Sequence, residues 1–195
     1  MDSISSNQQS SNPEETTRLL YKSWREQFAL PLLLGVLIFG AIVLVPAINA
    51  STSLVVDALF ITVYVVTGLV TVIRFSYIVR MTVFLLGVYA LGLGELITHG
   101  VLGDSLIFFF GIIVFSTMLI SPRIGLVATI VNILTFALFA FLFLTGQLLP
   151  LNPNAVNATL ADWFSAIGVV IMFGAVVILG FQRLEQEFTN AQRQI

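Results

Sequence analysis

The sequence predicts an all-α membrane protein in which six transmembrane helices are followed by a coiled-coil signalling helix. Three observations lead to this fold class. The 195-residue chain is 58% hydrophobic and only 9% charged, whereas soluble domains carry about 25% charged residues. The apolar residues gather in six runs, each close to the roughly 20 residues that span a bilayer. The basic residues all fall on one side of a six-span layout.

Two segments precede the apolar runs. Residues 1–11 are rich in Ser, Asn and Gln, and we expect them to form a disordered cytoplasmic tail. Residues 12–28 begin with the helix-start signal Asn12-Pro13, and we expect an amphipathic juxtamembrane helix there. An ordinary cytoplasmic lead-in to the first span is the alternative. The expected membrane-surface anchors of this helix are Arg18, Lys22, Trp24 and Arg25.

The six apolar runs form the predicted bundle over residues 29–181. Most connections between them are short, which favours antiparallel neighbours. The longer connection, residues 146–161, has the Pro- and Asn-rich composition of a loop. The expected spans are about 29–48, 54–73, 80–98, 104–121, 124–145 and 162–181.

The placement of charge predicts the orientation of the chain. With six spans, all eight Lys and Arg residues lie on one side, and the other side carries Asp57, Asp104 and Asp162 near its helix ends. The positive-inside rule then places both termini in the cytoplasm. An odd number of spans would break this separation of charge.

The C-terminal stretch is expected to leave the membrane as one unbroken helix. An apolar run from Trp163 to Phe181 is followed by polar residues 182–195, with no Pro or Gly to end the helix. The apolar residues across this change recur at the 3-4 spacing of a coiled coil, which predicts signal transmission and a homodimer. The pattern is incomplete where the sequence stops, so we expect a truncated linker to an output domain. The positions are Phe181, Leu184, Phe188, Ala191 and Ile195.

Charged residues inside a span are costly and are therefore candidate sites. Glu95 lies about one turn before the end of the third span, and His99 follows on the same helix face. With Asp57, Asp104 and Trp163, they form our hypothesis for ligand or stimulus sensing at the outer end. The alternative is an interfacial carboxylate and ordinary helix N-terminal charges. One His with scattered carboxylates is a weak metal-binding set, so no metal site is expected.

Small and polar residues predict how the spans pack. A stripe of small residues in the third span lets neighbouring helices approach closely, which favours a central position for this helix. The stripe is Gly87, Ala90, Gly94 and Thr98. In the fifth span, Asn132 and Thr135 are expected to hydrogen-bond to a neighbouring helix. Ser116 and Thr117 can bond to their own helix backbone.

Several function classes lack their residues in this chain. It has no Cys, so disulfides, thiol catalysis and Cys-ligated metals are excluded. No Lys lies in a span, which excludes a retinal Schiff base, and no protease, Walker or kinase motif occurs. We therefore expect no enzyme activity, no cofactor and no nucleic-acid partner. The 17 Phe residues are typical of lipid contact. A flat hydrophobic ligand such as a quinone is the alternative, which composition does not show.

Two stretches, Thr17 to Phe28 and Phe181 to Phe188, resemble the N-terminal membrane region of multi-pass bacterial sensor histidine kinases, and are most similar to those of Chloroflexi-type bacteria. The resemblance implies a homodimeric six-helix input domain in the bacterial inner membrane. A helical linker and GAF, PAS or kinase domains would follow it. No kinase motif is present, so no catalytic residue is carried over.

Three hypotheses about function follow from the sequence. The first is a sensor module that passes a stimulus through the sixth helix to a cytoplasmic output domain. The second is a small transporter or channel subunit that uses Glu95 as a coupling carboxylate. The third is a structural membrane protein without a ligand, which would tolerate replacement of Glu95 by Leu.

Overall fold

The computed structural model describes residues 30–42, 45, 48, 54–73 and 75–192, with the side chains of 188, 189, 191 and 192 left out. The predicted tail 1–11, the helix 12–28 and parts of the first span lie outside the described residues. So do Arg18, Lys22, Trp24, Arg25 and Ile195, together with the side chains of Phe188 and Ala191. What the sequence predicts for these residues stays a prediction.

Every regular element in the described residues is a helix, which confirms the all-α class for that part of the chain. Within the part of the chain that the structure describes, four helices are long and apolar enough to cross a membrane, and two apolar helices are shorter, namely Leu30–Ile42 and Ser105–Ile120. The six-span layout therefore stays a prediction. The elements are α2 (Leu54–Val72), α3 (Tyr77–His99), α4 (Ser105–Phe115), the π-helix η1 (Ser116–Ile120), α5 (Pro122–Leu144) and α6 (Leu160–Gln192).

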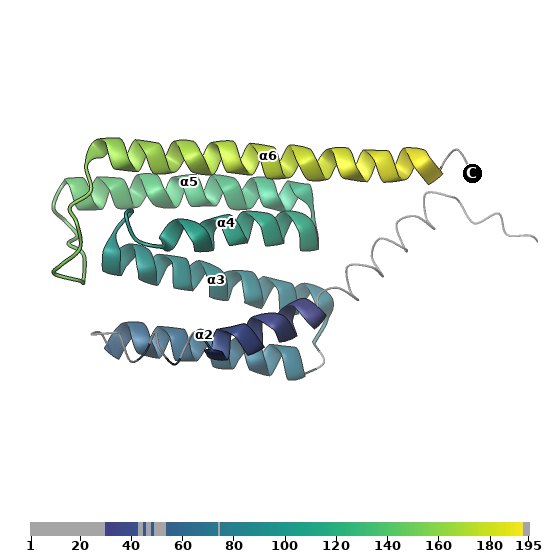
Figure 1. Ribbon diagram of the computed structural model, residues 1–195, viewed down its shortest axis with the longest axis horizontal. Helices are drawn as coiled ribbons and strands as arrows, with labels where there is room; N and C mark the ends of the chain where they lie inside the picture. Colours follow the sequence, from purple (N-terminus) through teal and green to yellow (C-terminus); the bar gives the residue numbers. More distant parts are fainter. Residues whose placement is uncertain (1–29, 43–44, 46–47, 49–53, 74, 193–195) are drawn as a thin grey trace, which may run out of the picture.

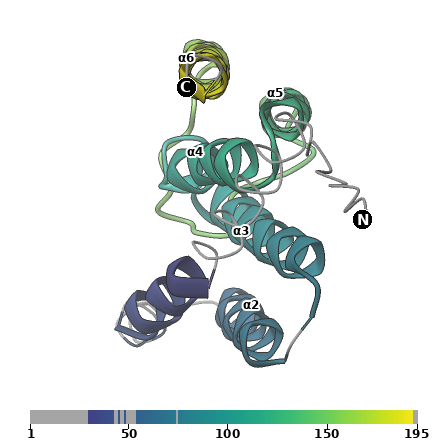
Figure 2. The ribbon, with the colours of Figure 1, turned by 90° about the vertical axis from the view of Figure 1, so that its right-hand side faces the viewer.

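The helices lie roughly parallel to one long axis and are stacked in layers (Figure 1). An end-on view shows α5 and α6 on one side, α3 and α4 in the middle, and α2 with helix Leu30–Ile42 on the other side (Figure 2). In the middle layer, α3 contacts both α2 and α4, while α6 contacts α4, η1 and α5. We call the end where α3 stops and α4 and α6 begin the His99 end, and the opposite end the Pro122 end.

Helices α5 and α6 start slightly earlier than the apolar runs predict, and a capping side chain lies at each of these starts. Ser121 is the N-cap of α5 and its Oγ accepts from the backbone N–H of Ile124 at 3.2 Å, with Pro122 in the first turn. At the start of α6, the carboxylate of Asp162 accepts from both the N–H and the hydroxyl of Thr159, each at 2.7 Å. Such a reciprocal cap satisfies N–H groups that the helix leaves unpaired.

The buried side chains of the described residues form two clusters. The larger one lies between α3, α4, α5 and α6 and contains Leu96, Phe109, Ile113, Phe136, Trp163 and Val170. The smaller one joins helix Leu30–Ile42 to α3 and η1 through Leu33, Met81, Phe84 and Leu119. In the described residues, the helices α3 to α6 thus form the main core, and helix Leu30–Ile42 is held to it mainly through the start of α3.

Polar residues at membrane depth make the predicted hydrogen bonds. Asn132 donates from Nδ2 to the carbonyl of Phe109 on α4 at 3.0 Å. Thr135 lies 2.7 Å from the hydroxyl of Tyr89 on α3, so both expected interhelical contacts of α5 are confirmed. They suit a medium in which an unpaired polar group has no water to bond.

The end of α4 widens into a π-helix, which the sequence analysis did not predict. The hydroxyls of Ser116 and Thr117 both donate to the carbonyl of Ile113, at 3.2 and 2.6 Å, as expected for their own backbone. These bonds compete with the normal helix ladder, and the N–H of Ser121 bonds to the carbonyl of Ser116, five residues earlier. Segments of this kind occur frequently at functional sites.

Candidate functional site

The candidate sensing residues lie at the His99 end of the bundle, where α3 turns into α4. Glu95 and His99 are one helical turn apart on α3, and Nδ1 of His99 lies 2.8 Å from Oε1 of Glu95. The Glu95 side chain is 16% exposed and that of His99 is 40% exposed. The carboxylate is therefore largely enclosed and faces an imidazole that reaches the surface. The two groups form an ion pair when the imidazole is protonated, although Nδ1 of His99 has no partner with hydrogen-bond geometry among the described residues.

The α3–α4 turn folds back over this pair and depends on two glycines. Gly100 has φ of +74°, a conformation that L side chains rarely adopt, and its N–H bonds to the carbonyl of Leu96. Gly103 has no room for a side chain, because an added Cβ would lie 2.7 Å from Cβ of His99 and 3.2 Å from Oε1 of Glu95. The turn thus restricts the space beside the Glu95–His99 pair.

The α5–α6 loop also closes over the end of α3. The backbone N–H groups of Leu151 and Asn152 donate to the carbonyls of Ile97 and Thr98, at 3.1 and 3.0 Å. The last carbonyls of a helix lack partners within the helix, so these bonds tie the loop that leads into α6 directly to α3. Figure 1 shows this loop running down the His99 end from α5 across to α3.

Trp163, the aromatic candidate, begins the buried face of α6. Its indole is 1% exposed and stacks on Phe143 with ring centroids 5.7 Å apart. It also borders a small pocket of about 210 Å³ beneath the loop, lined by Gly100, Phe143, Leu144, Pro150 and Asn157 among others. Within the described residues, the buried Nε1 of Trp163 has no hydrogen-bond partner. Trp163 thus connects the loop, the pocket and α6.

The structure brings together only part of the predicted sensing set. Glu95, His99, Asp57 and Asp104 do not line the pocket beside Trp163. Asp57 lies in the first turn of α2, and Asp104 is the exposed N-cap residue of α4 without a side-chain capping bond. No three His, Asp or Glu side chains of the described residues come close enough to hold a metal ion. Glu95 and His99 are the candidates in direct contact.

The small-residue stripe of α3 faces α2. A Cβ added at Gly87 would lie 3.0 Å from Val63, and one added at Gly94 would lie 2.6 Å from Leu59, both on α2. Thr98 is buried and donates to the carbonyl of Gly94, while Ala90 is half-buried. On the other side of α3, Gly92 abuts Phe108 of α4. Small residues therefore let α3 sit closely between two neighbours.

The predicted transmitting residues continue the buried face of α6. Counting back from Phe181 at the same 3-4 spacing gives the positions Val177, Gly174, Val170, Ile167 and Trp163. Trp163, Val170 and Gly174 are buried, and Ile167 and Val177 pack against the main core. Phe181 is half-buried, and Leu184 is 49% exposed. One stripe thus starts inside the bundle and continues on the part of α6 beyond it. We call it the α6 stripe.

Two features of the structure were not predicted from the sequence. The first is η1, whose only sequence signal is the adjacent hydroxyl pair Ser116-Thr117 within an apolar run. The second is an apolar cleft between helix Leu30–Ile42, α2, α3 and α4. Its lining residues look like ordinary lipid-facing residues in the sequence, because lipid and helix interiors select the same apolar side chains.

Comparison with known proteins identifies one family. The family model MASE11, which describes a membrane-associated sensory domain, matches residues 23–187. The match covers all the described helices apart from the last residues of α6. No curated protein and no solved structure matches the chain.

Proposed function

The chain belongs to the MASE11 family of membrane-associated sensory domains, and on this premise we propose that it is the input module of a bacterial signalling protein. A stimulus at the His99 end or within the membrane changes the position of α6, which passes the change to an output domain such as a histidine kinase. The proposal includes six spans, both termini in the cytoplasm of a bacterial cell, and a homodimer through α6. The membrane localisation itself follows from the family and the apolar helices.

The observation that carries the proposal is the continuity of α6. This helix runs without interruption for 33 residues, from Leu160 to Gln192, and thus extends beyond Phe181. At about 1.5 Å per residue it is about 50 Å long, whereas the hydrocarbon core of a bilayer is about 30 Å thick. Figure 1 shows α6 extending past the ends of α3, α4 and α5 at the Pro122 end.

The α6 stripe explains how a shift in the position of one bundle helix reaches the exposed part of α6. Gly174 and Val170 on this stripe are buried against the neighbouring helices, whereas Leu184 on the same stripe is half exposed. A helix transmits a rotation or translation along its length because its backbone hydrogen bonds keep it rigid. A shift of α4 or α5 against the buried part of the stripe therefore moves the predicted coiled-coil positions.

The Glu95–His99 pair is our choice for the responsive end, with Trp163 as its link to α6. The pair lies beside the Gly100–Gly103 turn, and the loop that caps α3 leads directly into α6. A change in the charge of the pair or in the position of the turn would act on that loop. Two states a few kcal/mol apart are enough for a switch.

The experiment that tests the transmission step uses the absence of native Cys. We would place single Cys residues at Phe181 and Leu184 on the α6 stripe and, as matched controls, at Gln182 and Arg183 off the stripe. Oxidation in native membranes should give disulfide-linked dimers at the two stripe positions and at least fivefold less at the two controls. Equal yields at all four positions, or no dimer at any, would refute the α6 homodimer.

The same readout tests the responsive end. In the Leu184→Cys background, Glu95→Gln should change the dimer yield at least twofold, because it removes the charge that faces His99. Arg123→Gln, an exposed position at the start of α5, serves as a charge-removal control and should leave the yield unchanged. If Glu95→Gln has no effect on the yield but abolishes a proton or cation flux into liposomes, the transporter hypothesis replaces the sensor.

The orientation of the chain is tested by labelling with a membrane-impermeant maleimide. Asn154→Cys places a thiol in the exposed α5–α6 loop, and Arg183→Cys places one on the far part of α6. Asn154→Cys should react in intact cells and Arg183→Cys only after permeabilisation. The opposite pattern would reverse the proposed topology while leaving family membership unaffected.

A further inference from the structure

A cleft opens between four helices about halfway along the bundle, and neither Glu95 nor His99 lines it. Its volume is about 380 Å³, within the range of about 300–1,000 Å³ that small-molecule sites occupy. Val63 and Val88 line it and lie halfway along α2 and α3. Phe39, at its rim, is 70% exposed, so the cleft reaches the lipid-facing surface. A molecule dissolved in the bilayer interior can therefore enter it sideways.

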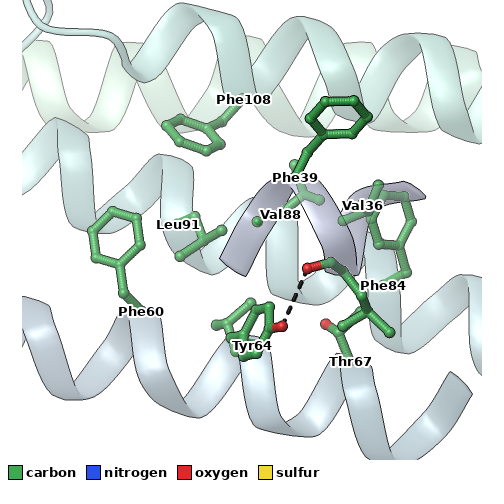
Figure 3. Close-up of a pocket in the computed structure, with 12 residues that line it drawn as sticks. Val36, Phe39, Phe60, Tyr64, Thr67, Phe84, Val88, Leu91 and Phe108 are labelled. Atoms are coloured by element: carbon green, nitrogen blue, oxygen red, sulfur yellow. Dashed lines mark hydrogen bonds between the residues drawn. The ribbon is translucent and has the colours of Figure 1, made fainter. Parts of the chain in front are cut away.

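Aromatic rings dominate the wall of the cleft, and each of the four helices supplies at least one (Figure 3). Phe84 lies deep, at 3% exposure, while Phe39 lies at the surface. Aromatic pairs gain beyond their contact area from offset-stacked or edge-to-face geometry, which a saturated lipid chain cannot supply. The rings are Phe39, Phe60, Tyr64, Phe84 and Phe108.

Two hydroxyl groups interrupt this apolar wall, and one of them is unpartnered. Tyr64 donates to the carbonyl of Leu37 at 3.1 Å and so links α2 to helix Leu30–Ile42. Thr67 is 6% exposed and lines the cleft, and its hydroxyl bonds to no group in the part of the chain that the structure describes. Figure 3 shows the Tyr64 and Thr67 side chains on the same side of the cleft. In a membrane, a hydroxyl that borders an apolar cleft without a partner is costly, so this group favours an occupant with a hydrogen-bonding oxygen.

Burial of apolar surface alone does not favour a ligand over lipid tails in this cleft. Inside a bilayer the competing lipid tails are as apolar as the cleft, so association depends on packing and hydrogen bonds. The five rings and the free Thr67 hydroxyl therefore decide which molecule displaces lipid. They suit a neutral, flat ring that carries an oxygen acceptor.

The cleft is mechanically connected to α6 through three consecutive Phe residues of α4. Phe108 lines the cleft and abuts Gly92 of α3. Phe109 packs edge-to-face on Phe136 of α5, with ring centroids 4.9 Å apart. Phe110 stacks on Phe173 of α6, with ring centroids 4.3 Å apart. A displacement of Phe108 by an occupant therefore acts on the helix that lies between the cleft and α6.

We propose that this cleft binds one neutral, flat, ring-bearing lipophile from the bilayer core, whose ring packs among the five aromatic side chains and whose oxygen accepts from Thr67. The further statement that this molecule is the stimulus rests on the proposed sensory function. The chemistry required is that of a quinone-like ring.

The test uses the full chain in lipid nanodiscs and a diazirine-tagged decylubiquinone as the photoreactive probe. Labelling should saturate, and mass spectrometry should locate it on α2, α3, α4 or helix Leu30–Ile42. Unlabelled decylubiquinone should compete at least tenfold better than decylcyclohexane, which has the same chain but neither oxygens nor a flat ring. Labelling that does not saturate, or equal competition by both compounds, overturns the site and indicates general lipid occupancy. This comparison needs no variant and is independent of folding defects.

Two matched pairs of variants locate the site. Thr67→Val removes the free hydroxyl and should weaken binding about 2- to 12-fold, the usual worth of one hydrogen bond. Thr71→Val removes a hydroxyl one turn away that already bonds to the carbonyl of Thr67, and binding should stay within twofold. Leu91→Trp fills the cleft and should reduce labelling at least tenfold, whereas Leu86→Trp, on the exposed side of α3, should not. Equal effects within either pair overturn the assignment.

The stimulus role and the sensory function fail in distinguishable ways. With saturating decylubiquinone, the disulfide yield of Leu184→Cys should change at least twofold, and Leu91→Trp should abolish this change. Saturable binding with an unchanged yield overturns the stimulus role. The disulfide yields measured without ligand test the α6 dimer separately. If the stripe positions do not exceed the control positions there, the proposed α6 dimer is refuted, independently of whether decylubiquinone binds.

Discussion

Replacing Gly174 by Ala tests whether α6 packs on α5 as closely as the structure indicates. Gly174 lies on the α6 stripe, and a Cβ added there would lie 2.7 Å from Cγ2 and 2.8 Å from Oγ1 of Thr129 on α5. Thr129 is 6% exposed, and its hydroxyl donates to the carbonyl of Gly125 at 2.9 Å. The side chain therefore has to give up this bond, or α6 has to move away from α5.

The expected cost follows from these contacts. Overpacking a well-packed interior typically costs about 1–3 kcal/mol. The matched control is Gly168→Ala on the same helix, where nothing lies within 4 Å of an added Cβ. Both changes raise helix propensity equally, by about 0.5–1 kcal/mol, so their difference isolates the contact with Thr129. Gly174→Ala should therefore be about 1–3 kcal/mol less stable than Gly168→Ala.

The assay is thermal unfolding of the purified chain in one detergent, with denaturant unfolding in mixed micelles as a second measure. At about 2–4 °C per kcal/mol for a chain of this size, the midpoint of Gly174→Ala should lie about 2–12 °C below that of Gly168→Ala. The double variant Gly174→Ala/Thr129→Ala removes both clashing atoms and should recover much of the loss. Equal midpoints for the two single variants would refute the close approach of α5 and α6.

Three further variants test other contacts in the same assay. Gly125→Ala should lose about 1–3 kcal/mol, because the added Cβ would lie 2.9 Å from Cβ of the buried Thr117; an unchanged midpoint would place η1 farther from α5. Asp162→Ala should lose about 0.5–2 kcal/mol, since the N–H and hydroxyl of Thr159 lose their acceptor; no loss would mean that the cap is open in solution. Asn132→Leu should cost about 0.6–1.7 kcal/mol, the measured scale of interhelical hydrogen bonds in membranes, and a larger loss would indicate a wider polar network.

Local features of the fold could be predicted from the sequence because they depend on neighbours in the chain. The helical class, the uninterrupted α6 and the contact partners of Glu95 and His99 follow from hydropathy and from the i, i+4 spacing. The sequence also predicted that Asn132 and Thr135 hydrogen-bond to a neighbouring helix, since a polar group at membrane depth must find a partner. Which helix supplies that partner was not predicted.

Other features depend on residues far apart in the sequence. The π-helix η1 arises where Ser116 and Thr117 meet the turn into α5, and its hydroxyls gave only a weak signal. The apolar cleft that Thr67 lines requires side chains from four helices, and no single segment of the sequence marks it. The contacts within the predicted sensing set also depend on tertiary packing. Asp57 and Asp104 share one end of the bundle with Glu95, but this does not bring them into contact with it.

The sequence by itself determined that this chain is a helical membrane domain whose last helix continues beyond the apolar core. Hydropathy and the 3-4 spacing of the α6 stripe are properties of a single segment, so they can be read without knowing its neighbours. The tertiary structure decided which face of each helix is buried, where α3 sits between α2 and α4, and that a ring-lined cleft surrounds Thr67. The physical reason is that lipid-facing and protein-facing positions are both apolar in a membrane, so only the packing itself tells them apart.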